Sequence, residues 1–198
     1  MMRLVLLSGG MDSAMLLARE VSKGIPAAVF FEYGQANLVP ERKAAAAICR
    51  DLGVAFISLP LPSLTRNLSP GAIIPSRNLI FCSVAANLIQ SLGGGTILLG
   101  ACAEDQSGFP DCRPEFIDAV NQILEISELN SRVEAPHAHL TKSQALDLFR
   151  EEGLPQEVLE RSYSCYSGSE PPCRRCPACL KRAAAFFPFD GEHRDPAR

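Results

Sequence analysis

The chain has 198 residues, of which 47% are hydrophobic and 21% are charged, and this balance is ordinary for a globular domain with its own core. Its formal net charge of −3 argues against a protein that coats nucleic acid, because binding many phosphates requires a basic surface. No apolar run reaches the roughly 18–20 residues of a membrane span, and the first residues lack the pattern of a signal peptide. We therefore expect a cytoplasmic protein without nucleic-acid or membrane partners.

Short apolar runs alternate with amphipathic stretches along most of the chain. Strands are predicted at residues 3–7, 27–31, 54–59 and 96–100, where runs such as RLVLL and TILLG are typical of buried strands. Helices are predicted from Asp12, over residues 40–53, 78–92 and 114–129, and from Thr141 to Gly153. Gln144 follows Thr141 by three residues, which predicts a capping box. The alternation predicts an α/β fold with a doubly wound, mostly parallel sheet.

The segment LLSGGMDSAM lies where the first predicted strand passes into the first helix, a place where open parallel sheets bind ligands. Gly9 and Gly10 let the backbone approach a ligand closely, and Ser8 and Ser13 supply hydroxyls. The free N–H groups of the helix start favour an anion, so the segment predicts a phosphate-binding loop. It lacks the lysine of a Walker A loop and the spacing of a G-x-G-x-x-G motif. The plain alternative is a glycine-rich turn before a polar helix start.

Four of the eight cysteines occur between residues 165 and 179, with the spacing C-x7-C-x2-C-x2-C. This spacing predicts a closed tetrahedral Zn²⁺ site that is structural, because four thiolates leave no coordination position open for a substrate. The expected ligands are Cys165, Cys173, Cys176 and Cys179. The alternatives are a [4Fe–4S] cluster, disulfides in an oxidising compartment, and a redox-active C-x-x-C pair.

The spelling S-G-G-x-D-S resembles the loop of the PP-loop ATP pyrophosphatases, which cleave ATP between its α and β phosphates. The segments FEYGQ, SRNLIF, DQSGFPDCRPEF, LTKSQ and the cysteine segment follow in an order that resembles the QueC family nearly from end to end. The resemblance implies a Rossmann-like fold of the adenine nucleotide alpha hydrolase type over residues 1–160. It also implies a zinc-binding segment at 161–187 packed on the same domain, a flexible tail at 188–198, and a homodimer.

The resemblance further implies an ATP- and Mg²⁺-dependent C–N ligase. QueC-like enzymes adenylate the carboxylate of 7-carboxy-7-deazaguanine, and ammonia then attacks the adenylate to give an amide. A second ATP activates the amide, and loss of AMP leaves the nitrile 7-cyano-7-deazaguanine of the queuosine pathway. In such a reaction the protein mainly supplies positioning and charge stabilisation.

Individual roles follow from the same resemblance. The expected ligands of ATP and pyrophosphate are Ser8, Gly9, Gly10, Asp12, Ser13, Arg77 and Asn78. The expected catalytic residues are Asp12, Ser13, Arg77 and Lys142, with Asp12 near Mg²⁺ or the helix start. The expected deazaguanine-binding residues are Asp105, Ser107, Gly108, Asp111 and Arg113, because an acidic side chain suits the amidine-like edge of a guanine-like ring. The alternatives are a cap on the following helix for Asp111 and a solvated charge for Lys142.

Several positions depart from the family pattern. ANLVPERK lacks the usual Arg-His pair, Ser76 replaces a glycine, and CAEDQSG replaces the commoner CETDYSG. These losses leave adenylation intact but put the amide-to-nitrile step in doubt. One alternative function is transfer of the activated deazaguanine to a protein amine, as in QueC-like antiphage systems of the CBASS type, and another is a zinc-knuckle binding module without catalysis. A basic patch, expected to face either phosphates or solvent, is formed by Arg174, Arg175, Lys181 and Arg182.

Overall fold

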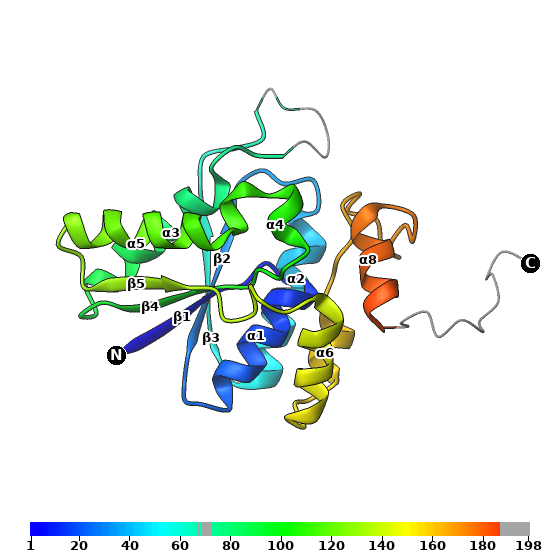
Figure 1. Ribbon diagram of the computed structural model, residues 1–198. Helices are drawn as coiled ribbons and strands as arrows, with labels where there is room; N and C mark the ends of the chain where they lie inside the picture. The colour runs from blue at the N-terminus through cyan, green and yellow to red at the C-terminus, as the bar shows by residue number, and fades with distance from the viewer. Residues whose placement is uncertain (67, 69–72, 187–198) are drawn as a thin grey trace, which may run out of the picture.

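A parallel sheet forms the centre of the computed structural model, which describes residues 1–66, 68 and 73–186 (Figure 1). Its strands are β1 (Met2–Leu6), β2 (Ala27–Glu32), β3 (Ala55–Pro60), β4 (Gly95–Leu99) and β5 (Ser131–Glu134). The spatial order is β3-β2-β1-β4-β5, and each neighbouring pair is parallel. The chain order reverses between β1 and β4, so the ends of these strands form the topological switch point at which such sheets bind ligands.

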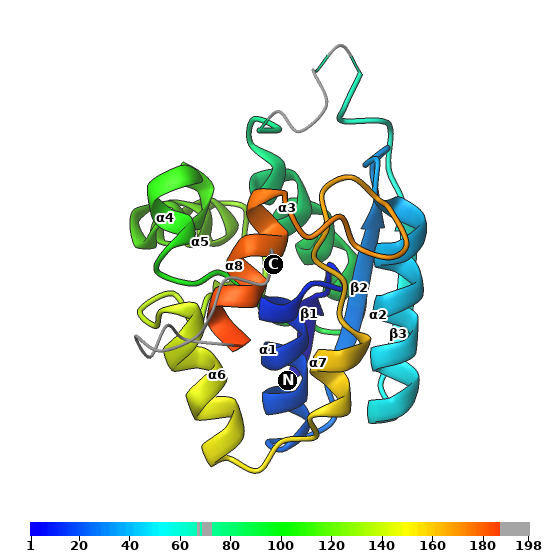
Figure 2. The ribbon, with the colours of Figure 1, turned by 90° about the vertical axis from the view of Figure 1, so that its right-hand side faces the viewer.

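Helices cover both faces of the sheet, as Figure 1 shows. One face carries α1 (Met11–Val21), α2 (Leu38–Leu52), α6 (Lys142–Glu151) and α7 (Glu157–Arg161). The other face carries α3 (Arg77–Gln90) and α5 (Pro114–Ile126). The short turns α4 (Asp105–Gly108) and η1 (Pro110–Cys112) follow β4, and α8 (Pro177–Phe186) packs beside α6, which is clearest in Figure 2.

The strands contribute side chains to two separate cores. In β1, Leu4 and Leu6 pack toward α3 and α5, whereas Val5 packs toward α1 and α2. All five residues of β4 are buried. Covering both faces of a parallel sheet with helices requires strands that are apolar on both sides, which explains the continuous apolar runs of the sequence.

The predicted α/β class and the doubly wound arrangement are confirmed, and the predicted elements lie within three residues of the observed ones. The capping box is also present, since Thr141 Oγ1 accepts from Gln144 N at 3.1 Å and Gln144 Oε1 accepts from Thr141 N at 2.9 Å. The sequence analysis missed the short elements α4 (Asp105–Gly108), η1 (Pro110–Cys112), β5 and α7, and it also missed α8, which begins among the clustered cysteines. The predicted tail at 188–198 lies outside the described residues. Within the part that is described, no helix combines the length and hydropathy of a membrane span.

Candidate functional site

The carboxyl ends of β1, β2 and β4 open into one cavity with a volume of about 270 Å³. This size is near the lower end for small-molecule sites. The cavity is bounded by the loop that joins β1 to α1, the starts of α2, α3 and α6, the loop after β4, and one face of α8. The sequence-predicted residues that line it are Ser8, Gly10, Asp12, Ser13, Arg77, Asn78, Asp105 and Lys142.

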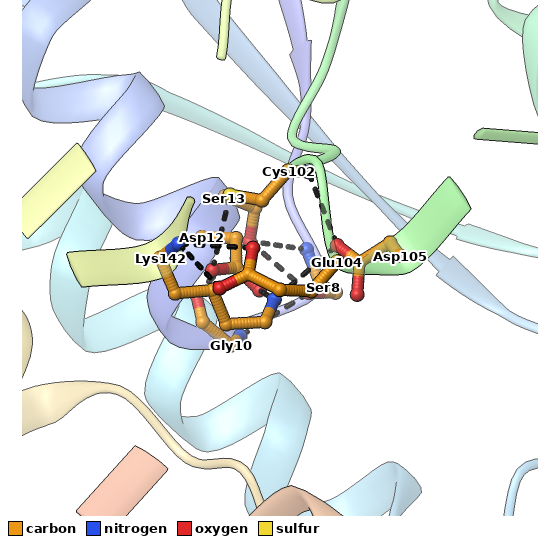
Figure 3. Close-up of polar contacts among 8 residues, drawn as sticks. All are labelled: Ser8, Gly10, Asp12, Ser13, Cys102, Glu104, Asp105 and Lys142. Atoms are coloured by element: carbon orange, nitrogen blue, oxygen red, sulfur yellow. Dashed lines mark hydrogen bonds and ion pairs between the residues drawn. The ribbon is translucent and has the colours of Figure 1, made fainter. Parts of the chain in front are cut away.

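Serine hydroxyls shape the loop between β1 and α1 (Figure 3). Ser13 Oγ donates to Gly10 O at 3.1 Å and accepts from Ser8 N at 3.2 Å. Gly9 has a φ of +79°, and a Cβ at this position would lie 2.4 Å from the carbonyl oxygen of Glu41, so a larger residue does not fit. The loop therefore presents the N-terminus of α1 to the cavity, which is an arrangement that binds anions.

Lys142 connects this loop with the loop after β4. Its Nζ lies 2.6 Å from Asp12 Oδ2 and 3.2 Å from Asp105 Oδ2 (Figure 3). Burial raises the pKa of Asp12, although the charge of Lys142 acts against this shift. Burial alone would lower the pKa of Lys142, but the charges of Asp12 and Asp105 outweigh it and raise that pKa. Lys142 is therefore a charged residue held between two carboxylates, and not a solvated surface lysine.

The predicted deazaguanine-binding residues do not all meet in the cavity. Asp105 lines it, whereas Ser107, Gly108, Asp111 and Arg113 do not. Ser107 Oγ donates to the backbone oxygen of Glu104 at 3.0 Å, and Arg113 Nε donates to that of Gln106 at 3.0 Å. The substrate role of these residues stays a prediction.

Asp111 has a capping role, but on a different helix from the one expected. Its Oδ2 accepts from Asn78 N at 3.1 Å in the first turn of α3, and Asn78 Nδ2 donates to the Asp111 backbone oxygen at 3.0 Å. The expectation that Asp111 caps the following helix is therefore wrong. Sequence distance hid this contact, because α3 begins some thirty residues earlier and meets Asp111 only in the folded sheet.

The start of α2 contributes a carboxyl group that the sequence analysis missed. Glu41 lines the cavity, and its Oε1 accepts from Asn37 Nδ2 at 2.7 Å. The same Asn37 amide donates to Cys165 O at 3.3 Å, which links the site to the cysteine segment. Burial raises the pKa of Glu41 to about 7, against the opposing effects of the Gln35 amide and the charge of Arg77. The available signal was a glutamate in the helix turn that directly follows a strand end.

Aromatic side chains form one wall of the cavity. The rings of Phe31 and Phe81 stack with their centroids 4.5 Å apart, and the ring of Tyr33 lies 5.2 Å from that of Phe81. Phe109 lines the cavity as well. Flat apolar surfaces of this kind suit a planar heterocyclic ligand.

The four clustered cysteines converge as their spacing predicts. The Sγ atoms of Cys165, Cys173, Cys176 and Cys179 all lie within 4.8 Å of one another. Four thiolates around one Zn²⁺ at 2.3 Å are about 3.8 Å apart, so a small adjustment brings this group into a tetrahedral shell. Burial would raise the pKa of Cys165, but hydrogen bonds from Cys173 and Ser167 lower it to about 4, which favours the thiolate that metal binding requires. The donor set fits a thiophilic metal; its identity stays a prediction.

Known proteins resemble this chain over nearly its whole length. The family model described as queuosine biosynthesis protein QueC matches residues 2–69 and 62–189. The chain is 33% identical to a 7-cyano-7-deazaguanine synthase of Thermoplasma acidophilum, over 95% of this chain and 88% of that one. It is 32% identical to a synthase of the same description from Campylobacter fetus, over 91% of this chain and 90% of that one.

A solved structure supports the fold independently. It is described as a predicted subunit of tRNA methyltransferase from Methanocaldococcus jannaschii, and the two structures superpose with a TM-score of 0.52 at 19% identity. The match covers 76% of this chain and 75% of the other. At this identity the likeness concerns the arrangement of strands and helices only.

Proposed function

Because the chain belongs to the QueC family, we propose that it is an ATP-dependent ligase that adenylates the carboxylate of 7-carboxy-7-deazaguanine. The observation that carries this proposal is one cavity that joins a phosphate-binding loop to the group formed by Asp12, Lys142 and Asp105. A carboxylate is a poor electrophile, because its oxygen is a bad leaving group. Transfer of AMP to that oxygen makes it a good one, so the adenylate can be attacked by a nitrogen nucleophile.

The loop between β1 and α1 supports binding of the phosphates of ATP. The N–H groups at the start of α1 lie at a helix N-terminus, where a negative charge is stabilised. The hydroxyls of Ser8 and Ser13 bond to each other and to the backbone, and so hold the loop in this shape. Carboxylate oxygens are the ligands that Mg²⁺ prefers, and Asp12 would hold this ion beside the loop. When bound, Mg²⁺ neutralises phosphate charge and orients the reacting phosphate. The charge of Lys142 favours the ionised form of Asp12 against the effect of burial, and its hydrogen bond holds the side chain in place.

The aromatic wall and Asp105 support binding of the deazaguanine in the same cavity. The stacked pair of Phe31 and Phe81 offers a flat surface for the ring. Asp105 uses Oδ2 for both of its described hydrogen bonds, from Cys102 N at 3.1 Å and from Lys142 Nζ at 3.2 Å. Oδ1 is therefore available to accept from the amidine-like edge of the substrate.

The later steps complete the proposed reaction. Ammonia forms a C–N bond at the adenylated carbon, AMP leaves with the former carboxylate oxygen, and a proton is released. A second ATP adenylates the amide oxygen, and loss of this AMP together with two protons leaves the nitrile. We further propose that the four cysteines hold structural Zn²⁺, because their sulfurs form a closed set without an open coordination position.

Product analysis tests this function directly. The purified protein is incubated with ATP, Mg²⁺, ammonium and 7-carboxy-7-deazaguanine, and AMP and the deazaguanine products are followed by mass. Two AMP per nitrile are expected. If the reaction stops at the amide, the function is limited to the first turnover. If a protein amine gains the mass of the deazaguanine, that protein is the alternative acceptor. The function is wrong if this acid elicits no AMP.

A matched pair of variants shows whether the described cavity performs the reaction. Asp12→Asn keeps the shape of the side chain but removes the charge that Lys142 and Mg²⁺ need, so AMP release is expected to fall at least 100-fold. Asp147→Asn removes a charge from an exposed side chain on α6 and is expected to leave the rate within twofold. Equal rates in the two variants would place the reaction elsewhere.

A further inference from the structure

The helix α8 brings positive charge to the cavity from the cysteine segment. It includes Cys179, so it starts inside the metal-binding cluster. Ala178, Lys181 and Arg182 line the cavity, and their spacing places them on one face of the helix. Residues 8, 10, 12 and 13 of the phosphate-binding loop line the same cavity. The predicted basic patch is therefore divided, because Arg174 and Arg175 do not line the cavity.

Arg182 fixes the orientation of this helix. Its Nη1 donates to Ser162 Oγ at 2.5 Å and its Nη2 donates to Leu159 O at 2.7 Å. Its guanidinium carbon lies 5.0 Å from the ring centroid of Phe186. These contacts use Arg182 to hold α8 against α7, and they set the position of the neighbouring Lys181.

Two of the four cations that line the cavity already have partners, because Lys142 pairs with two carboxylates and Arg182 donates to Ser162 and Leu159. Arg77 Nε is buried without a hydrogen-bond partner among the described residues. Lys181 forms no hydrogen bond or ion pair with any residue in the ranges 1–66, 68 and 73–186. Its charge is therefore available to a ligand in the cavity.

We propose that Lys181 binds the pyrophosphate portion of ATP, so that the metal-binding segment supplies the cation that the sequence of the phosphate-binding loop lacks. The loop SGGMDS has no lysine after its glycines, and the leaving pyrophosphate carries several negative charges. A compact ammonium on a flexible stem suits such a group. The inference rests on the proposed function and deepens it, because it makes α8 part of the ATP site. A metal held by the four cysteines would then position Lys181 in addition to stabilising the fold.

Calorimetric titration with inorganic pyrophosphate and Mg²⁺ tests this inference without any deazaguanine. A protein that activates a different acid would still give a result, so failure of the inference and failure of the proposed function are distinguishable. Lys181→Met is expected to weaken pyrophosphate binding about 10- to 100-fold, and Lys181→Arg is expected to retain most of it. Arg175→Met is the matched control, because it removes one charge from the same segment outside the cavity. It is expected to change the affinity by less than about twofold.

Four results would overturn the inference. The first is an affinity of Lys181→Met within twofold of the unaltered protein, and the second is equal weakening by Arg175→Met. The third is absence of pyrophosphate binding by the unaltered protein. Metal content and unfolding temperature are measured for each variant. If Lys181→Met lost its metal, the side chain would have a structural role in the metal-binding segment, and this result would also overturn the inference.

Discussion

Lys142 Nζ lies 2.6 Å from Asp12 Oδ2, and this contact joins the first turn of α6 to the first turn of α1. The two residues are 130 positions apart in the chain. Asp105 Oδ2 lies 3.2 Å from the same ammonium group. One cation thus holds two carboxylates beside a helix N-terminus, at the place where ATP phosphates and Mg²⁺ are expected.

Replacing Lys142 with Met removes the charge and keeps most of the length of the side chain. Asp12 and Asp105 then face each other without a cation, so the free energy of unfolding is expected to fall by about 1–3 kcal/mol. AMP release is expected to fall at least 100-fold, because the phosphate-binding loop loses an ordered partner. Urea unfolding and an AMP assay measure the two effects.

Arg150→Met is the matched control for this variant, because Arg150 lies on the same helix in an exposed pair with Asp147. Its effect on the free energy of unfolding is expected to stay within about 0.5 kcal/mol. Similar losses in both variants would show that α6 is sensitive to any substitution, and that the contact with Asp12 has no special role.

Glu41 gives the stability of the protein a pH dependence of known sign. Burial raises its pKa from 4.5 to about 7, so the folded protein keeps a proton that the unfolded chain has lost. The stabilisation is full below pH 4.5 and is lost as the pH rises through 7. Between pH 5 and 8, Glu41→Gln is therefore expected to gain about 2–3 kcal/mol relative to the unaltered protein. Urea unfolding at several pH values measures this difference, and a difference independent of pH would refute the shifted pKa.

The sheet and the shape of the loop between β1 and α1 were predictable from the sequence because both depend on local patterns. Buried parallel strands require continuous apolar runs, and the loop is set by adjacent glycines and serines. The converging cysteines were also predictable, since a C-x-x-C turn directs two sulfurs toward one ion. These features need only short stretches of chain.

Contacts between distant segments were not predictable in the same way. The cap of Asp111 on α3, the pairing of Lys142 with Asp12 and the approach of α8 to the cavity depend on how helices pack across the sheet. Glu41 was overlooked because its chemistry depends on burial, which one sequence does not reveal. The residue types indicated which side chains could take part in a site, but the sequence did not indicate which residues they contact.

The contact of Asp111 with α3 distinguishes a structural role from a substrate-binding one. Asp111→Ala removes the acceptor of Asn78 N, so the free energy of unfolding is expected to fall by about 1 kcal/mol. Asp118→Ala on the exposed surface of α5 is the control and is expected to have little effect. If Asp111→Ala left stability unchanged and raised only the KM for the deazaguanine, the side chain would contact substrate as first predicted.

Loss of the metal is expected to affect the fold before it affects the chemistry. Cys176→Ser removes one of four ligands, and α8 carries Ala185 into a buried core, so metal content and unfolding temperature should both fall. Cys49→Ala, at a buried cysteine outside the cluster, should keep the metal. Elemental analysis identifies zinc or iron. A Cys176→Ser protein that kept its metal and fold but lost turnover would contradict the structural role.

The fate of the carboxylate oxygens tests the central claim most directly. The protein is incubated with 7-carboxy-7-deazaguanine that carries ¹⁸O in both carboxylate positions, together with unlabelled ATP, Mg²⁺ and ammonium. The mass of the AMP formed is then measured by mass spectrometry. If the carboxylate is adenylated in the described cavity, each AMP carries one ¹⁸O, because the former carboxylate oxygen leaves with it. Unlabelled AMP, or ADP in its place, would contradict the account.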